Sequence, residues 1–146
     1  MHNNVIYKAT EASEILSITR IIHDCKFDRD KLVFDSASSS LSIEFEYEEL
    51  DKKIILSNML LIKKIRIPIT KYVLIINNIK NYIYDTSNYN GPGLDDFFNK
   101  ILYDDELNKI TILTIIGAPI DVFVTKLNIS IEDTCELVGE KIKIVF

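Results

Sequence analysis

Apolar and polar residues alternate most regularly over residues 41–48, which read LSIEFEYE. Successive side chains of a β-strand point to opposite faces, so this pattern predicts a strand with one face on the core and one face in water. Pro68 lacks a backbone N–H and favours an edge strand or a bend, and Asn77-Asn78 is a candidate break between strands. Less regular apolar segments predict further strands over 5–8, 60–69, 71–85, 109–117, 119–131 and 140–146, the last after a turn at Gly139.

Two segments have helical spacing instead. In residues 94–107, Phe97, Phe98, Ile101 and Leu102 fall on one helical face, and Asp95 or Asp96 is a natural N-cap, so we predict a helix near residues 95–107. Residues 10–22 are ambiguous. Thr10 could cap a helix there, whereas the β-branched end of the segment, Ile18 to Ile22, is also compatible with a strand.

Residues 25–34 fit a β-hairpin with a two-residue turn at Arg29-Asp30. This register places the following apolar residues on one face: Cys25, Phe27, Leu32 and Phe34. Arg-Asp is not a favoured two-residue turn, so the register is the weaker part of this prediction. By this register Cys25 faces the apolar side and is expected to act as a small core residue.

Together these segments predict a single domain over residues 1–146. Its class is α+β and β-rich, with a mostly antiparallel sheet, the helix near 95–107 and an N-terminal helix over part of residues 10–22. Whether the strands form one sheet or two packed sheets stays open from the sequence. Strands and helices do not alternate along the chain, which argues against a doubly wound parallel fold.

Charge and composition narrow the function. The formal net charge is −5 and the chain lacks a dense basic tract, so nucleic-acid binding is not expected. The longest apolar stretches, 54–62 and 110–124, are shorter than the ~20 residues of a spanning helix, and we interpret both as core strands of a protein without a membrane segment. Two cysteines provide no disulfide framework, and no secretion signal is apparent, so a cytoplasmic location is expected.

Residues 20–30, RIIHDCKFDRD, contain the residue types of metal sites and acid/base pairs. On a strand, His23 and Cys25 would share a face, but a zinc site would also need His2 and Cys135 from distant parts of the chain, so we predict no metal and no cofactor. Adjacent strand residues point to opposite faces, which argues against a His23-Asp24 dyad. Either residue could still act with a distant partner.

Two surfaces are candidates for contact. Four tyrosines surround the turn-rich loop at residues 87–93: Tyr82, Tyr84, Tyr89 and Tyr103. An acidic ladder, which begins at Glu44, Glu46 and Glu48, would suit a basic protein surface. We therefore predict a non-catalytic protein-binding or self-associating module that uses an edge strand and one of these surfaces. Its candidate binding residues are His23, Asp24, Tyr84 and Tyr89. The alternative is a small enzyme or ligand-binding domain with a cleft that includes His23 and Asp24.

Overall fold

The structure is a computed structural model that describes residues 3–85 and 95–146. These residues form ten strands, one α-helix and two short 3₁₀ turns. In chain order they are β1 (Asn4–Ala9), η1 (Ala12–Glu14), α1 (Ile15–Ile22), β2 (Lys26–Asp35), β3 (Ser40–Glu48), η2 (Leu50–Lys52), β4 (Ile54–Met59), β5 (Ile62–Ile76), β6 (Ile79–Ile83), β7 (Asp95–Asp104), β8 (Lys109–Thr114), β9 (Ile120–Val124) and β10 (Ile129–Val145). The predicted β-rich α+β class with antiparallel strand pairing is confirmed.

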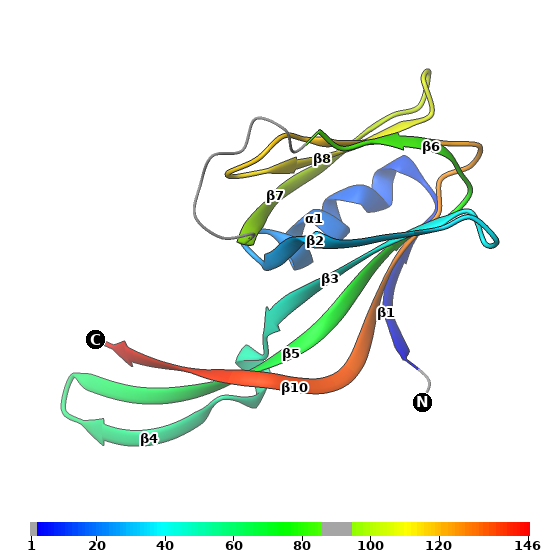
Figure 1. Ribbon diagram of the computed structural model, residues 1–146. Coiled ribbons are helices and arrows are strands. Elements are labelled where there is room, and N and C mark those ends of the chain that lie inside the picture. The colour runs from blue at the N-terminus through cyan, green and yellow to red at the C-terminus, as the bar shows by residue number, and fades with distance from the viewer. Residues whose placement is uncertain (1–2, 86–94) are drawn as a thin grey trace.

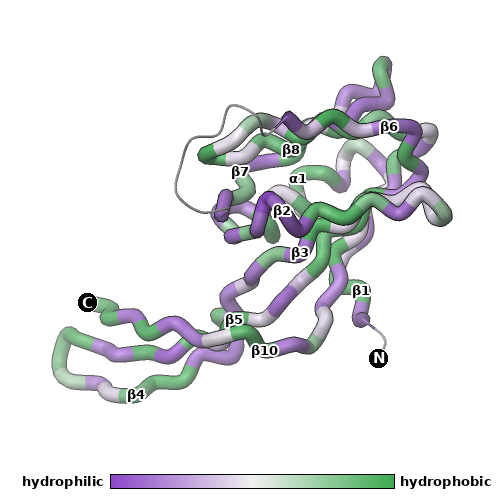
Figure 2. Tube along the Cα trace, viewed as in Figure 1, coloured by the Kyte–Doolittle hydropathy of each residue, from purple (hydrophilic) through white to green (hydrophobic). Residues whose placement is uncertain are grey.

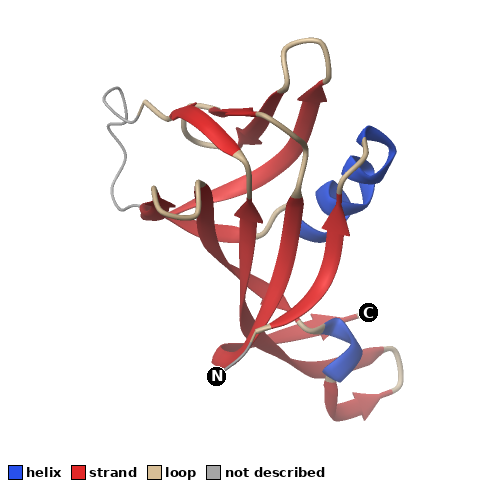
Figure 3. Cartoon of the chain, turned by 90° about the vertical axis from the view of Figure 1, so that its right-hand side faces the viewer, coloured by secondary structure: helices blue, strands red, loops and turns tan. Residues whose placement is uncertain are grey.

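All ten strands belong to one hydrogen-bonded sheet. Its order is β1-β10-β5-β3-β2-β7-β8-β9-β6, and β4 adds to β5 outside this path. The sheet curls, so that β6, β7 and β8 lie above β3, β5 and β10 with α1 between the two halves (Figure 1). A view from the side shows the same curvature (Figure 3). The far end of the path comes back to the β2–β3 hairpin, where Ile79 N–H donates to Ser39 O at 3.0 Å.

The core lies between these halves and is centred on β2, which pairs with β3 on one side and with β7 on the other. Phe27 stacks on Phe98 with ring centroids 4.3 Å apart, and Phe45 meets Phe98 edge-on at 5.6 Å. These three rings come from β2, β3 and β7, so one aromatic cluster holds both halves together. Helix α1 adds its buried residues Ile15 and Ile18 to the same core and contacts β7 and β1.

Helix α1 falls within the ambiguous segment 10–22. It begins after a turn in which the Glu14 carboxylate accepts the backbone N–H groups of Thr10 and Glu11, both at 3.1 Å. Within the described residues, no helix is long and apolar enough to cross a membrane.

Three strand predictions agree closely with the structure: residues 5–8 lie in β1, residues 41–48 lie in β3 with alternating burial, and Asn77-Asn78 separates β5 from β6.

The predicted helix near residues 95–107 is wrong, because Asp95–Asp104 is strand β7. A register shift between Phe98 and Lys100 explains the error. A strand normally buries every second residue, but this β-bulge inserts one extra residue, so the buried Phe98 and Ile101 stand three apart. That spacing imitates the period of a helix. Asp96 is a buried strand residue rather than an N-cap.

The predicted turn at Arg29-Asp30 is also wrong. The hairpin turn lies in the polar segment after Asp35, and β2 instead carries a wide bulge, with a register shift against β3 between Phe27 and Leu32. Within it, Asp28 Oδ1 accepts the N–H of Asp30 at 2.9 Å, a local bend that an Asp side chain favours. The predicted turn at Gly139 is a bulge inside β10, which runs on to Val145.

Part of the sheet extends away from the body as a three-stranded ribbon, which we call the arm (Figure 1). It consists of β4, residues 62–69 of β5 and residues 137–145 of β10. The pairing of β5 with β3 ends at Ile69, and its pairing with β4 begins at Arg66. Pro68 lies between these points, where its missing N–H costs no bond to either strand, in agreement with the predicted bend.

Candidate functional site

His23 and Asp24 form a side-chain pair at the end of α1. The N–H of His23 donates to Thr19 O at 2.9 Å, so His23 caps the helix rather than lying on a strand. Asp24 has a φ of 64°, and its N–H donates to Phe98 O at 2.8 Å. This left-handed turn brings His23 Nε2 to 3.4 Å from Asp24 Oδ2. The predicted opposite orientation of the two side chains is therefore wrong, because the backbone here is a left-handed turn rather than an extended strand.

The imidazole of His23 is fixed by a second contact. Its Nδ1 lies 2.7 Å from the carbonyl oxygen of Asn99 in β7. A carbonyl only accepts hydrogen bonds, so Nδ1 carries the proton and the lone pair of a neutral ring is on Nε2. Both side chains are more than half exposed, at 53% for His23 and 67% for Asp24. The unprotonated nitrogen of a neutral ring is therefore the one beside Asp24, at a partly exposed position.

The pair borders a cleft of about 660 Å³ between the body and the arm. Tyr47, Glu48 and Leu50 form part of its wall, and Lys141 and Lys143 of β10 approach from the arm. The volume falls within the ~300–1,000 Å³ typical of small-molecule sites. The lining differs from such sites, which are mostly apolar, because eight of the residues around this cleft are Arg, Lys, His, Asp or Glu: Arg20, His23, Asp24, Lys26, Glu46, Glu48, Lys141 and Lys143.

The acidic groups of the cleft are already paired. Glu48 accepts hydrogen bonds from Lys141 at 3.0 Å and from Lys143 at 3.3 Å, and Glu46 lies 3.3 Å from Lys26. Burial alone would raise the pKa of Glu48, but the two lysines outweigh it and lower the pKa. The cleft therefore presents internally compensated charge rather than a strong field of one sign.

Cys25 also lines the cleft but is a poor nucleophile. Its Sγ donates to Ile21 O at 3.4 Å, and the side chain packs against the core. Burial raises the pKa of the thiol to about 12, with further contributions from the negative charges of Glu48 and Asp24. Since the thiolate is the reactive form, catalysis by Cys25 at neutral pH is disfavoured.

The tyrosine candidates do not join this pair. Tyr84 is not among the residues that line the cleft. Burial raises the pKa of its hydroxyl to about 12, and the nearby Asp96 carboxylate adds to the effect. Tyr84 therefore lies on the side of Asp96 and Arg29, away from His23. Tyr89 and the loop at 87–93 lie outside the described residues.

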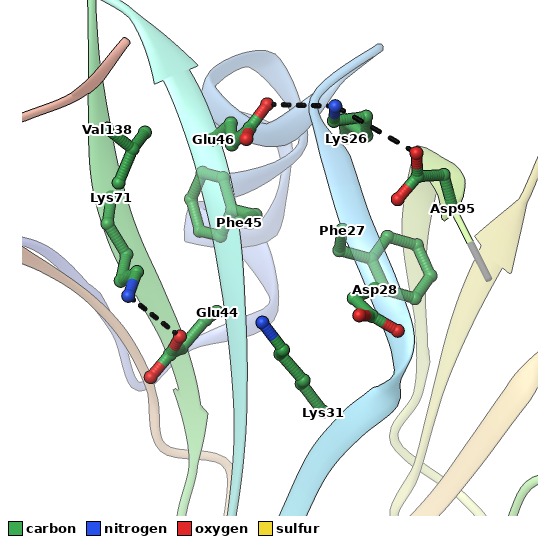
Figure 4. A pocket seen from close by; sticks show the side chains of 10 residues that line it. All are labelled: Lys26, Phe27, Asp28, Lys31, Glu44, Phe45, Glu46, Lys71, Asp95 and Val138. Carbon is green, nitrogen blue, oxygen red and sulfur yellow. Dashed lines mark ion pairs between the residues drawn. The ribbon is translucent and has the colours of Figure 1, made fainter. Parts of the chain in front are cut away.

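The acidic ladder on β3 is balanced by lysines as well. Figure 4 shows Lys71 beside Glu44 and Lys26 between Glu46 and Asp95, around a pocket of about 160 Å³. The Nζ of Lys71 is 3.4 Å from Glu44 Oε2 and 3.1 Å from Glu136 Oε2. The buried rings of Phe27 and Phe45 line the floor of this pocket, next to the bulge of β2. A ladder whose carboxylates are each paired attracts a basic partner only weakly.

The arm is the surface that sequence reasoning missed. Residues 54–62 were interpreted as a core strand, but every residue of β4 is exposed. At the tip, Met59, Leu60 and Leu61 are 72%, 102% and 82% exposed. Figure 2 shows hydrophobic residues at this tip and along β4. Other large apolar residues are exposed along the arm: Ile54, Ile55, Leu56, Ile62, Leu137, Val138, Ile142, Ile144 and Val145.

A signal of this exposure was present in the sequence. The run from Ile54 to Ile62 has no charge, yet Lys52 and Lys53 precede it and Lys63 and Lys64 follow it. Core strands of a compact domain are usually bounded by turn residues, whereas here a turn is made by Leu60 in the left-handed region, with φ 49°. An apolar residue at the tip of a turn has no core to enter. The arm is thus exposed by its topology.

The described residues contain no group of three or more His, Cys, Asp or Glu side chains that could hold a metal ion. Cys25 and Cys135 are both free, and Cys135 is exposed on β10, where Asn4 Nδ2 donates to its Sγ.

In comparisons with known proteins, no family model, no curated protein and no solved structure matches the chain. Function is therefore inferred from the geometry of the cleft and the arm.

Proposed function

We propose that this protein is a small cytoplasmic, non-catalytic protein-binding module whose contact surface is the arm. One observation carries the proposal: the arm exposes many large apolar side chains, including Met59, Leu60 and Leu61. The largest apolar patch of a typical monomer covers ~300–600 Å², and larger patches are characteristic of interaction sites. The cytoplasmic part is supported by two cysteines that stay unpaired.

The position of the arm supports binding rather than catalysis. It carries the apolar side chains away from the body, where a partner can reach both faces of the ribbon and its edges. Removal of apolar surface from water is the dominant favourable contribution to most protein–protein association. We therefore expect Met59, Leu60 and Leu61 at the tip each to contribute to the binding free energy when a partner covers them.

Site-specific photo-cross-linking in the producing cells tests the proposal. A benzophenone amino acid at position 61, at the tip of the arm, should give a discrete protein adduct. The matched control places the same group at position 107, where Leu107 is 60% exposed in the turn between β7 and β8. We expect at least tenfold more adduct from position 61. Equal yields at both positions, or no adduct at either, would contradict the proposal.

The cleft favours a second candidate, a small enzyme or ligand-binding domain. The supporting observation is that His23 and Asp24 project into a concave space together with groups from β3 and β10. Against it stand the paired carboxylates and the raised pKa of Cys25.

A thermal-shift screen of small anions, metabolite-like acids and divalent cations separates the two candidates. A ligand of the cleft would raise the Tm of the wild type and lose this effect in His23→Ala, while Asn81→Ala, an exposed change on β6, would retain it. On the leading proposal we expect no ligand with this behaviour. One ligand that shifts the wild type and Asn81→Ala by several degrees, but not His23→Ala, would establish the second candidate.

A further inference from the structure

We infer that β4 of the arm pairs antiparallel with β4 of a second copy of this chain, so that two arms join into one six-stranded sheet. The inference rests on the proposed function and names its partner. The starting observation is that β4 pairs with β5 on one side only, and no described strand covers its other edge. The backbone N–H and C=O groups of that edge are therefore available to another strand.

The edge of β4 lacks the usual protection against such pairing. Natural edge strands carry lysine, proline or strong bulges that keep other strands away. Between Ile54 and Met59 the sequence is IILSNM, without charge or proline, and one bulge near Leu56 is its only irregularity. The opposite edge of the arm, residues 139–145 of β10, carries Glu140, Lys141 and Lys143. The β4 edge of the arm thus has no charged residue to keep another strand away, whereas the β10 edge has three.

The apolar surface of the arm is large enough for a dimer. The apolar side chains of β4 and the tip, from Ile54 to Ile62, together expose on the order of 1,000 Å², against about 800 Å² that each partner contributes to a stable interface of standard size. A short foreign peptide on the same edge would cover β4 but not the residues at the tip. A second arm covers both.

An antiparallel arrangement also explains why both ends of β4 are apolar. It places the tip of one copy, with Leu60 and Leu61, beside the base of β4 in the other copy. Leu50 and Ile54 at this base are 55% and 52% exposed. The contact is self-complementary, as the two-fold axis of a dimer requires. Because β4 has no charged residue, no like charges of the two β4 strands meet in it. The net charge of −5 repels two copies at long range, so salt should strengthen the dimer.

Charge exchange at Ser57 tests this geometry. Ser57 is exposed near the middle of β4, so position 57 of one copy lies close to position 57 of the other in any central register. The wild type should show twice the chain mass of 16.8 kDa by light scattering at micromolar concentration. Ser57→Lys and Ser57→Glu should each be monomeric through like-charge repulsion, and an equimolar mixture should recover the dimer. The control Asn81→Lys, on the edge strand β6, should leave the dimer intact.

Each contrary outcome has a definite meaning. A wild type that stays monomeric overturns the inference, and a photo-adduct from position 61 with a different protein would then leave the proposed function standing. A dimer that both Ser57 variants retain overturns the pairing through β4. The wild type could instead be a monomer that sediments with vesicles of phosphatidylcholine and phosphatidylserine, while the Leu61→Asp variant does not. The partner of the arm would then be a lipid surface, and both proposals would be overturned. Circular dichroism of the variants distinguishes dissociation from unfolding.

Discussion

Replacement of Asp96 by alanine should destabilise the protein by roughly 3–5 kcal/mol, because the carboxylate connects the start of β7 to the turn between β8 and β9. Asp96 is completely buried. Its Oδ1 accepts the N–H of Ile116 at 2.9 Å, and its Oδ2 accepts the N–H of Gly117, also at 2.9 Å. Oδ1 also accepts the N–H of Phe97 at 2.7 Å. Each hydrogen bond to a charged acceptor contributes about 1.5–3 kcal/mol, and alanine removes all three.

The surroundings of Asp96 leave little room for compensation. A Cβ at Gly117 would lie 3.0 Å from Asp96 Oδ2 and 3.7 Å from Arg29 Cδ, so the carboxylate and the Arg29 side chain flank the same turn. Arg29 is 5% exposed, and removal of a nearby negative charge makes its burial less favourable. Asp96→Asn retains an acceptor oxygen without the charge and should lie between the wild type and Asp96→Ala.

Urea denaturation followed by circular dichroism measures the effect, and the neighbouring Asp95 provides the control. Asp95 is 62% exposed, and its ion pair with Lys26 is 3.9 Å long. Asp95→Ala should therefore change the free energy of unfolding by no more than about 0.5 kcal/mol. If Asp96→Ala and Asp95→Ala have similar effects, the clamp makes no contribution and the account of Asp96 is wrong.

The sequence predicted the parts of the fold that depend on local periodicity. Residues 41–48 alternate without interruption, and the structure buries alternate positions such as Ile43 and Phe45. Local periodicity failed where the backbone is irregular. The bulge in β7 gave Phe98 and Ile101 a helical spacing, and the bend at Asp28 in β2 looked like a hairpin turn. A bulge is fixed by the neighbouring strands, which the local pattern does not contain.

The candidate site was predictable only in part, for a related reason. His23 and Asp24 were selected by residue type, and both do line a cleft. Their geometry depends on Asn99 and Phe98 of β7, which lie more than seventy residues away in the sequence. The prediction for the arm failed for a different reason. Hydrophobicity indicates that a residue tends to be buried, but not whether the burial occurs within its own chain or against another. Ile54 and Leu61 are apolar enough for a core, but the topology directs them away from the core of their own chain.

Substitution of Phe98 by alanine should also be severe, with a loss of about 3–5 kcal/mol. Phe98 is fully buried and is in contact with the rings of both Phe27 and Phe45. Its removal leaves a cavity where β2 connects the halves of the sheet, and it also removes two aromatic pairs worth about 0.5–1.5 kcal/mol each beyond their buried area. The same urea titration detects this as a large decrease in the midpoint.

The control for Phe98 lies on the same strand and also tests the strand itself. On a helix over residues 95–107, Phe98 and Leu102 would share the buried face, and both alanine variants would lose several kcal/mol. On the bulged strand, Leu102 is 47% exposed while Phe98 is buried. Leu102→Ala should therefore cost less than about 1 kcal/mol, because a half-exposed side chain loses little burial. Comparable losses for the two variants would favour the helix over β7, whereas a difference of at least about 2 kcal/mol follows from the strand and its bulge.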